Sequence, residues 1–227
     1  MFTFKLIFGV VLNLAIFGVL LFMPAGTLHW WRAWAFLGVV LVAEVATMVG
    51  VFSTNEELLN ERYKPPIQKG QPLADKLLAS ALVLTFCGVV AFIPLDVFRF
   101  HLAGKPGALV SFAGLLLFAA GWLIMSLSFK ENAFAAPVVK HQEERHQRVI
   151  DTGVYGVVRH PLYAGAIPLL IGMPLWLQSY AAALLAIVPI GILAARIRFE
   201  EEFLRRELKG YESYTERVRY RMIPFVW

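Results

Sequence analysis

The stretch that decides the fold is PLYAGAIPLLIGMPLWLQSYAAALLAIVPIGILAA, residues 161–195, which runs for 35 residues without a charged side chain. As a single helix it would be about 50 Å long, whereas the hydrocarbon core of a bilayer is about 30 Å thick. Gln178 and Ser179, at its middle, are its only strongly polar pair. We therefore predict a tight hairpin of two membrane helices, at about residues 161–177 and 180–199, with prolines kinking the first arm.

The composition places the rest of the chain in a membrane as well. Hydrophobic residues make up 59% of the 227 residues and charged residues only 16%, against about a quarter charged in soluble domains. The same figures exclude intrinsic disorder, which requires low hydrophobicity and high charge. Four further apolar runs are long enough to cross a bilayer, namely residues 6–31, 33–54, 77–95 and 106–129. We therefore predict an all-α, polytopic membrane protein with about six transmembrane helices, the first of them a retained helix and not a cleaved signal peptide.

The charged residues gather on one side of this arrangement. If Lys5 and the segments 53–76, 130–160 and 196–227 share a side, that side carries 18 of the 21 basic residues and 14 of the 16 acidic ones. The positive-inside rule then places this side, and with it both termini, in the cytoplasm. The polar chemistry of the chain is therefore expected on the cytoplasmic face.

The loop at residues 53–76 is predicted to contain a short surface helix. Asn55 is a suitable N-cap, two glutamates follow it in the first turn, and the prolines from Pro65 onward stop the helix. We expect it to lie at the membrane interface, with a role as a substrate gate as the alternative. The chain then divides into an N-terminal region, residues 1–129, with four spans and this loop, and a C-terminal region, residues 130–227.

Two groups of polar residues flank the hairpin. Arg159-His160-Pro161-Leu162-Tyr163 opens its first arm, and Arg196 followed by Glu200-Glu201-Glu202 lies at the end of its second arm. Arg196 and Glu200 are four residues apart, so they share a helix face and can pair. Because the arms are antiparallel, both groups reach the same membrane face. The alternatives are an interfacial anchor for the first group and a solvated helix end for the second.

The polar residues of the C-terminal region follow an ordered pattern. In chain order it comprises Gly153-Val154-Tyr155, Arg159-His160-Pro161-Leu162-Tyr163-Ala164-Gly165, Arg196, Glu200-Glu201, Leu204, Tyr211, Tyr214, Arg219 and Ile223-Pro224. This pattern resembles that of the integral-membrane methyltransferases that include isoprenylcysteine carboxyl methyltransferase and the phospholipid methyltransferases. The resemblance covers about residues 140–227, and residues 55–62 resemble a segment of bacterial members. The sequence departs from the family at Leu208-Lys209-Gly210-Tyr211, where Phe-Gly commonly precedes the paired tyrosines.

The resemblance implies an enzyme that transfers a methyl group from S-adenosylmethionine to a lipophilic or small amphiphilic acceptor, which could be a carboxylate, an amine or a thiol. It implies a cofactor pocket that faces the cytoplasm, in a multi-pass protein of a bacterial inner membrane. Arg196 and Glu200 are the expected catalytic residues, nearest to the methyl transfer. The expected cofactor contacts are Gln147, Tyr155, Arg159, His160, Pro161, Tyr163 and Glu201, the last at the ribose or the amino group.

Glu44, near the centre of the second span, allows a different interpretation. Carboxylates inside membranes are rare and by default suggest function, although a protonated or helix-bonded side chain is an equally simple explanation. A non-catalytic protein, such as a small transporter or a lipid-binding scaffold, would use Glu44 as a midplane site and the group around Arg159 as an anchor. The two related halves common in transporters are not evident in this sequence.

Metal and nucleic-acid binding are not expected. His141 and His146, with two glutamates between them, lack a ligand spacing such as His-Glu-x-x-His. The basic residues between Arg217 and Arg221 come shortly after a membrane helix, where they are more often found against anionic head groups or packed over a cofactor. The expected partners are therefore the lipid bilayer and the methyl acceptor, and the oligomeric state stays open.

Overall fold

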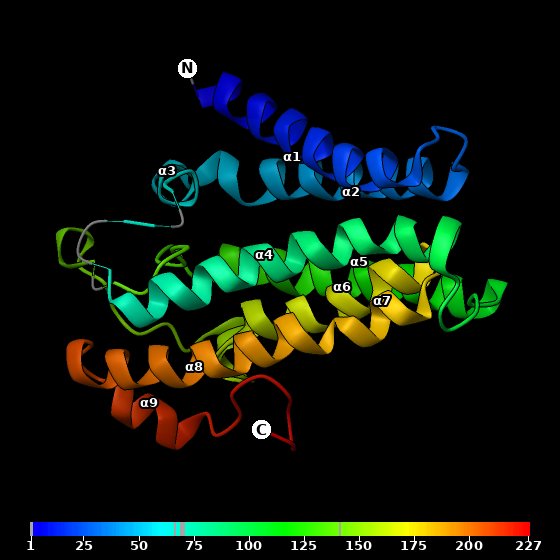
Figure 1. Cartoon of the computed structure of the whole chain (residues 1–227). Coiled ribbons are helices and arrows are strands. Elements are labelled where there is room, and N and C mark those ends of the chain that lie inside the picture. The colour runs from blue at the N-terminus through cyan, green and yellow to red at the C-terminus, as the bar shows by residue number, and fades with distance from the viewer. Residues whose placement is uncertain (1, 66, 69–70, 141) are drawn as a thin grey trace.

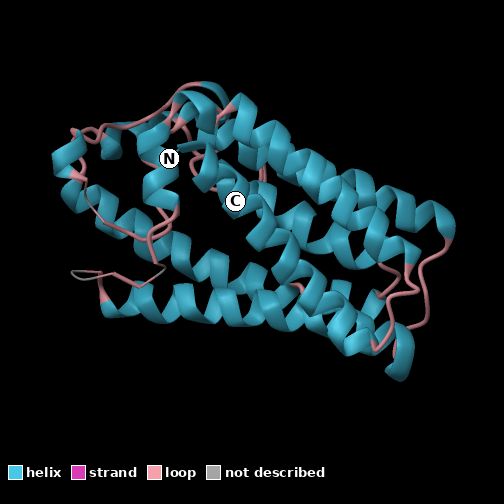
Figure 2. Cartoon of the chain, turned by 90° about the horizontal axis from the view of Figure 1, so that it is seen from above, coloured by secondary structure: helices cyan, strands magenta, loops and turns pink. Residues whose placement is uncertain are grey.

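A computed structural model of the chain describes residues 2–65, 67–68, 71–140 and 142–227. These residues form helices joined by loops, with no β-strand among them (Figure 2). The α-helices are α1 (Phe2–Ala25), α2 (Trp31–Gly50), α3 (Glu56–Arg62), α4 (Leu73–Leu95), α5 (Ala108–Glu131), α6 (Pro161–Trp176), α7 (Tyr180–Leu185), α8 (Ile187–Glu207) and α9 (Tyr211–Arg217). Short 3₁₀ turns lie at Phe52–Thr54, Glu143–Arg145 and Gly153–Gly156, and a π-helical turn, Asp96–Phe100, follows α4.

The length and composition of the helices confirm a polytopic membrane protein. Among the described residues, five helical stretches are long and apolar enough to cross a bilayer, namely Lys5–Ala25, Trp31–Thr54, Leu73–Phe100, Ala108–Glu131 and Tyr180–Glu207. The helix α6 is also apolar but shorter, as expected for the first arm of the hairpin. Figure 1 shows these helices running side by side along the length of the molecule.

The hairpin turns where its polar pair predicts. Gln178 adopts a left-handed backbone conformation with φ of 71°, and the Ser179 hydroxyl caps α7 by accepting a hydrogen bond from the Ala182 amide at 2.9 Å. The second arm differs from the single helix that we predicted, because it is divided into α7 and α8. The division precedes Pro189, which has no amide to donate and whose ring crowds the carbonyl four residues earlier, at Leu185, the last residue of α7.

Glycines let α5 and α6 approach each other closely. A Cβ atom on Gly121 would lie 2.5 Å from the Gly165 carbonyl oxygen, and a Cβ on Gly165 would lie 2.7 Å from the Gly121 carbonyl oxygen. Gly114 and Gly172 form an equivalent contact two turns further along. Small residues at a membrane helix interface allow backbone-to-backbone van der Waals contact. This contact fixes the start of α6, and with it the residues just before that helix, relative to α5.

The main hydrophobic core lies in the middle of the bundle, where it joins both halves of the chain. Phe36 from α2, Phe118 from α5 and Met173 from α6 are fully buried in it, together with Leu177 after α6. The rings of Phe36 and Phe118 meet edge to face at 4.8 Å between centroids. This core holds the N-terminal helices against the hairpin.

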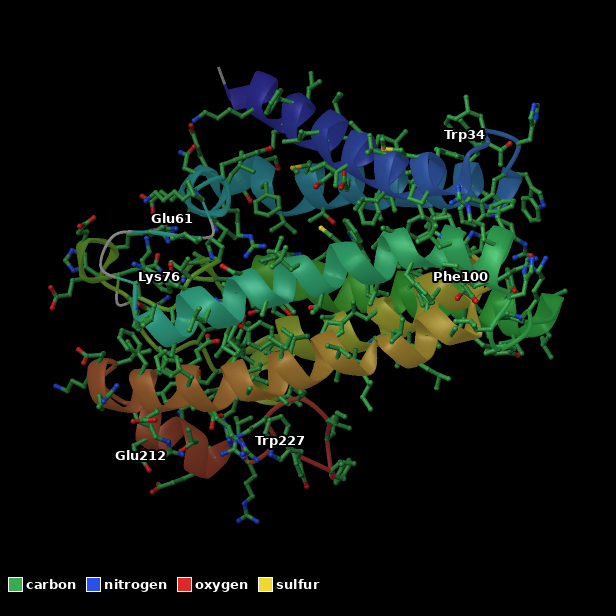
Figure 3. The ribbon with its side chains drawn as sticks, viewed as in Figure 1. Trp34, Glu61, Lys76, Phe100, Glu212 and Trp227 are labelled. Atoms are coloured by element: carbon green, nitrogen blue, oxygen red, sulfur yellow. The ribbon has the colours of Figure 1, made fainter. Side chains whose placement is uncertain are left out.

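Polar segments from distant parts of the chain meet at one end of the bundle, as the distribution of charge predicts. The Lys5 ammonium donates to the Asn60 side chain at 2.9 Å, and Arg159 donates to the Val218 carbonyl at 2.7 Å. Figure 3 shows Glu61, Lys76 and Glu212 toward this end, with Trp34 and Phe100 at the other. We call the first of these the polar end.

The predicted helix in the 53–76 loop is present as α3 and is tied to the polar end. The Asn55 side chain caps it by accepting from the Leu58 amide at 3.1 Å. At its other end Glu61 accepts from Lys140 at 2.8 Å and also pairs with Lys64. Burial alone would raise the pKa of Glu61, but the hydrogen bonds and positive charges of the two lysines outweigh it and lower the pKa below its usual value.

Candidate active site

A cavity opens at the polar end, between the loop after α5, the start of α6, the end of α8 and α9. Its empty volume, which includes space open to solvent, is about 830 Å³. The described residues that line it are Asn132, Phe134, Ala135, Ala136, Val138, Val139, Lys140, Gln142, Gln147, Arg148, Val149, Ile150, Tyr155, Arg159, His160, Leu162, Tyr163, Glu200, Leu204, Leu208, Tyr211 and Tyr214. We call it the polar-end cavity.

Glu200 faces this cavity, in contact with the first turn of α6. It is the one carboxylate among the described lining residues. The Tyr163 hydroxyl donates to a Glu200 oxygen at 2.7 Å, and the Tyr163 ring is nearly parallel to the His160 ring, 5.7 Å away. The hairpin therefore brings the two predicted groups together, as expected, through Tyr163 and Glu200.

Glu201 has a different environment from its neighbour, because its carboxylate is buried behind the cavity wall. Arg159 donates to one of its oxygens at 2.6 Å, and His160 lies 3.3 Å from the same oxygen. Arg221 donates to the other oxygen at 2.8 Å. The Arg159 and His160 amides also donate to the carbonyls of Tyr220 and Arg221, at 2.9 and 2.8 Å. Glu201 thus joins α8, the start of α6 and the C-terminal tail, the red segment of Figure 1.

Arg196 pairs with a residue that sequence reasoning missed. Its Nε donates to Asp75, at the start of α4, at 2.9 Å, and its Nη2 donates to the Pro137 carbonyl at 2.7 Å. The Asp75 side chain is fully buried, and its other oxygen accepts from Gln71 at 2.6 Å and from the Val139 amide at 2.9 Å. The pairing of Arg196 with Glu200 that we predicted is therefore replaced by one with Asp75, which lies 121 residues away in the sequence.

This leaves one part of the Arg196 guanidinium available. Two of its three nitrogens are engaged by Asp75 and Pro137, and Nη1 has no hydrogen-bond partner among the described residues. The guanidinium carbon lies 5.9 Å from the centre of the Tyr163 ring. Arg196 does not line the polar-end cavity itself but lies directly behind Tyr163, which does.

Tyr155, Tyr211 and Tyr214 line the cavity together with Tyr163. The Tyr214 hydroxyl donates to the Tyr155 carbonyl at 2.8 Å, which ties α9 to the turn at Gly153–Gly156. The Tyr211 hydroxyl is buried and has no hydrogen-bond partner among the described residues. Burial raises the pKa of Tyr211, and the negative charges of Glu201 and Glu200 raise it further. The hydroxyl therefore stays protonated and can donate a hydrogen bond to a bound molecule.

Of the nine predicted site residues, six line the polar-end cavity: Gln147, Tyr155, Arg159, His160, Tyr163 and Glu200. The Gln147 side chain accepts from the Gln142 amide at 2.9 Å, which leaves its NH₂ group without a hydrogen-bond partner among the described residues. Pro161 is the first residue of α6, where its missing amide costs nothing. Pro161, Arg196 and Glu201 do not line the cavity. Asp75 and Arg221 are the contacts that the sequence did not indicate, because their partners are remote along the chain.

The described residues contain no group of three or more His, Cys, Asp and Glu side chains that could hold a metal ion. His146 takes a left-handed conformation with φ of 49° after the 3₁₀ turn that precedes it. His141, which we had weighed as a ligand, lies outside the described residues.

The described residues form a polytopic helical membrane protein with a cavity at one end of its bundle. Residues 109–210 match the model of the phospholipid methyltransferase family. This region runs from the start of α5 to the residue before α9, so it contains the whole hairpin and Glu200. The match confirms the family resemblance that the sequence motifs indicated.

Two plant proteins named as protein-S-isoprenylcysteine O-methyltransferases are similar to part of the chain. A "Probable protein-S-isoprenylcysteine O-methyltransferase" from Oryza sativa subsp. indica is 30% identical over 121 residues, which are 52% of this chain and 62% of that protein. "Protein-S-isoprenylcysteine O-methyltransferase B" from Arabidopsis thaliana is 32% identical over 91 residues, 39% of this chain and 46% of that protein. The chain thus spans less than two thirds of the length of the curated relatives it matches.

Proposed function

We propose that this chain is a membrane methyltransferase that transfers a methyl group from S-adenosylmethionine to a lipophilic or small amphiphilic acceptor. The observation that carries the proposal is the convergence of the family-pattern residues on one cavity. Tyr155, His160, Tyr163, Glu200 and Tyr211 come from four separate segments and line the same space. Residues with unrelated structural roles would not be expected to converge in this way.

The lining of the cavity fits S-adenosylmethionine. The Glu200 carboxylate offers negative charge to a cofactor whose sulfonium carries a positive charge. The ring faces of Tyr155 and Tyr163 add cation–π attraction. The Tyr211 hydroxyl, which has no partner among the described residues, is a buried donor that an acceptor atom of the cofactor can satisfy. When bound, the cofactor supplies a methyl group activated by its positive sulfur.

We divide the predicted site residues into those that contact the cofactor and those that hold the contacting residues in place. We assign Gln147, Tyr155, Arg159, His160 and Tyr163 to cofactor contact, and Glu200 to the position nearest the reacting atoms. Glu200 can accept a proton at its carboxylate if the acceptor is an amine or a thiol.

Cofactor contact by Pro161 and Glu201 stays a prediction. The structure also gives each of these residues a role in supporting the cavity wall. Glu201 holds Arg159 and His160 in place through its hydrogen bonds, so it supports their cofactor contacts from behind the wall. Pro161 sets the backbone direction with which α6 leaves that wall.

Arg196 is the residue that we assign to the acceptor. Its Nη1 nitrogen is unengaged, and an arginine held by Asp75 and Pro137 has little freedom to rotate. If the acceptor is a carboxylate, Nη1 can donate to it and fix its direction of approach. Asp75 is then a positioning residue that acts through Arg196.

We further propose that the polar end faces the cytoplasm of a bacterial cell and that the protein lies in the inner membrane, with both termini on the cytoplasmic side. The positive-inside rule supports this orientation. The cofactor then reaches the cavity from water, and the acceptor reaches Arg196 from the bilayer. Accessibility of single cysteines introduced at Lys209 and Gly104 to an impermeant thiol reagent tests the orientation, in a background in which Cys87 is replaced.

Calorimetry with S-adenosylmethionine on the purified protein tests the cofactor. We expect Glu200→Gln to weaken binding about tenfold or more, as a lost charge-assisted contact would. Glu202→Gln is the matched control, because that neighbouring side chain is 70% exposed. Absence of binding to the wild type, or equal binding by both variants, would sink the cofactor assignment. Radiolabelled cofactor with a panel of thiols, prenylcysteines and phospholipids then identifies the acceptor class.

A further inference from the structure

The tail after α9 carries an exposed apolar segment, residues 223–226, which we call the tail loop. All four of its residues are apolar, and all four are exposed. The side chain of Phe225 is 87% exposed and that of Val226 is 75% exposed. No other large hydrophobic residue that the structure describes is as exposed as Phe225. An apolar surface of this kind at the polar end of the molecule indicates a contact with an apolar partner.

Hydrogen bonds within the tail close the tail loop. The amides of Arg221 and Ile223 donate to the Trp227 carbonyl at 3.0 and 3.1 Å, and the Trp227 amide donates back to the Ile223 carbonyl at 3.0 Å. Phe225 adopts a left-handed backbone conformation with φ of 65°, and its ring lies 5.2 Å from that of Tyr220. The apolar side chains are therefore displayed on a closed loop, so that little ordering is required when a partner binds.

The tail loop is held at the level where the polar end meets the membrane. The Arg159 and His160 amides, just before α6, donate to the carbonyls of Tyr220 and Arg221. The helix α6 is the apolar first arm of the hairpin, so its start marks the boundary between the polar end and the hydrocarbon. In Figure 1 the tail leads from α9 back toward the middle of the bundle, and Figure 3 shows Trp227 nearer to the middle than Glu212. The tail loop thus extends from the polar end toward the bilayer.

Two arginines without partners flank the tail loop. Arg219 precedes it in the chain. Arg198 lies on α8 three residues before Glu201, which accepts from the tail residue Arg221 at 2.8 Å. Residues three apart share a face of a helix, so Arg198 lies toward the side of α8 on which the tail docks. Both side chains are exposed, and neither has a hydrogen bond or an ion pair among the described residues. Their positive charges are therefore available to a negative group.

An apolar tip beside arginines fits the interfacial region of a bilayer. Apolar side chains enter the acyl region there, while cationic side chains meet the phosphates of the head groups. Unpaired arginines favour an anionic lipid, because the phosphate of phosphatidylcholine is balanced by the cation of its own head group. A second copy of the chain fits less well, because a twofold interface would bring the arginines of both copies together.

We propose that the tail loop inserts into the bilayer leaflet next to the polar end and that Arg198 and Arg219 bind the head group of an anionic phospholipid there. Phe225 and Val226 lie among the acyl chains, and the two guanidinium groups lie at the level of the phosphates. This surface is outside the polar-end cavity, so the inference goes beyond the proposed methyl transfer and does not depend on it.

Quenching of a fluorescent label by brominated lipids tests insertion. Phe225→Cys is labelled with bimane in full-length protein in which Cys87, the one cysteine of the chain, is replaced by serine. The protein is reconstituted in vesicles of phosphatidylcholine and phosphatidylglycerol, one of which carries bromine on its acyl chains. We expect both brominated lipids to quench this label. A label at Lys209→Cys, an exposed residue between α8 and α9, is the matched control and should be quenched at least about fivefold less.

The same vesicles test the choice of lipid. At equal mole fraction, brominated phosphatidylglycerol should quench the label at residue 225 at least about twofold more strongly than brominated phosphatidylcholine. Arg198→Gln combined with Arg219→Gln should abolish this preference while insertion remains. Arg206→Gln combined with Lys209→Gln removes the same charge elsewhere at the polar end and should keep the preference, since Arg206 is paired with Glu202 at 3.8 Å.

The outcomes that overturn the proposal are distinct. Equal quenching at residues 225 and 209 shows that the tail loop does not insert. Equal quenching by the two brominated lipids in the wild-type background, or an unchanged preference after both Arg198 and Arg219 are replaced, shows that these arginines do not bind an anionic lipid. A label at residue 225 that iodide in solution cannot reach, and that neither brominated lipid quenches, shows that protein covers the loop.

Discussion

Replacement of Asp75 by asparagine tests whether Arg196 depends on its long-range ion pair. The Arg196 Nε lies 2.9 Å from Asp75, whose side chain is fully buried, while that of Arg196 is 8% exposed. Loss of one partner of a buried ion pair costs about 3–5 kcal/mol, because the other charge remains without compensation. Asparagine keeps the volume and one acceptor oxygen, so we expect the free energy of unfolding to fall by about 3 kcal/mol. Methyl transfer should fall about a hundredfold, because Nη1 loses its fixed direction.

A double-variant cycle measures the pair directly, by reversible unfolding in mixed micelles followed by tryptophan fluorescence. Arg196→Gln should lower the free energy of unfolding by an amount similar to that lost in Asp75→Asn. The double variant should lose about 2–3 kcal/mol less than the sum of the two single losses. Asp151→Asn is the control: its pair with Arg217 has side chains 40% and 64% exposed, so its loss should cost less than about 1 kcal/mol. Additive effects of Asp75→Asn and Arg196→Gln, or equal cost at Asp75 and Asp151, would refute the reasoning.

Gly165→Ala should lower the free energy of unfolding by about 1–3 kcal/mol, because the new methyl group would lie 2.7 Å from the Gly121 carbonyl oxygen. Gly18→Ala has open space around it and should not lower that energy, so equal losses in a detergent unfolding series would contradict the close contact between α5 and α6. Tyr211→Phe should weaken S-adenosylmethionine binding about three- to tenfold without loss of stability, since its hydroxyl makes no bond within the described protein; unchanged affinity by calorimetry would remove Tyr211 from the site. Glu61 has a pKa below its ordinary value of 4.5, so its carboxylate stabilises the fold above that pH and loses this effect as the pH falls through the lowered pKa. When the pH is lowered from about 6 to about 3, the free energy of unfolding of Glu61→Gln should therefore fall less than that of the wild type. If the two proteins lose the same free energy over this range, the lysine contacts of Glu61 do not stabilise the fold.

The membrane fold could be predicted from the sequence because it depends on local composition. The uncharged run at residues 161–195 is too long for one span, and its single polar pair marks the turn. The break between α7 and α8 was missed, because Pro189 was not read as a boundary within an apolar arm. A proline in a membrane helix is compatible with either a kink or a break, and packing decides between them.

The candidate site could be predicted only in part, because some of its residues are held by partners that are far away in the sequence. The motif residues are clustered in the sequence, and six of the nine line one cavity. The partners that orient them are remote: Asp75 reaches Arg196 from another helix, and Arg221 reaches Glu201 from the tail. Helical spacing instead favoured Arg196 with Glu200, since residues four apart share a face of a helix.

The three donors on Glu201 also imply an order of assembly. Arg159 and His160 are synthesised before α8, but Arg221 follows α8 and α9 in the chain. Segments that emerge first from the ribosome can fold first, so the hairpin can enter the membrane while Glu201 still lacks one of its partners. The contacts that hold Arg159 and His160 from behind the cavity wall are complete only when the tail docks. In a nascent chain, these two lining residues would therefore reach their final support after the hairpin is made.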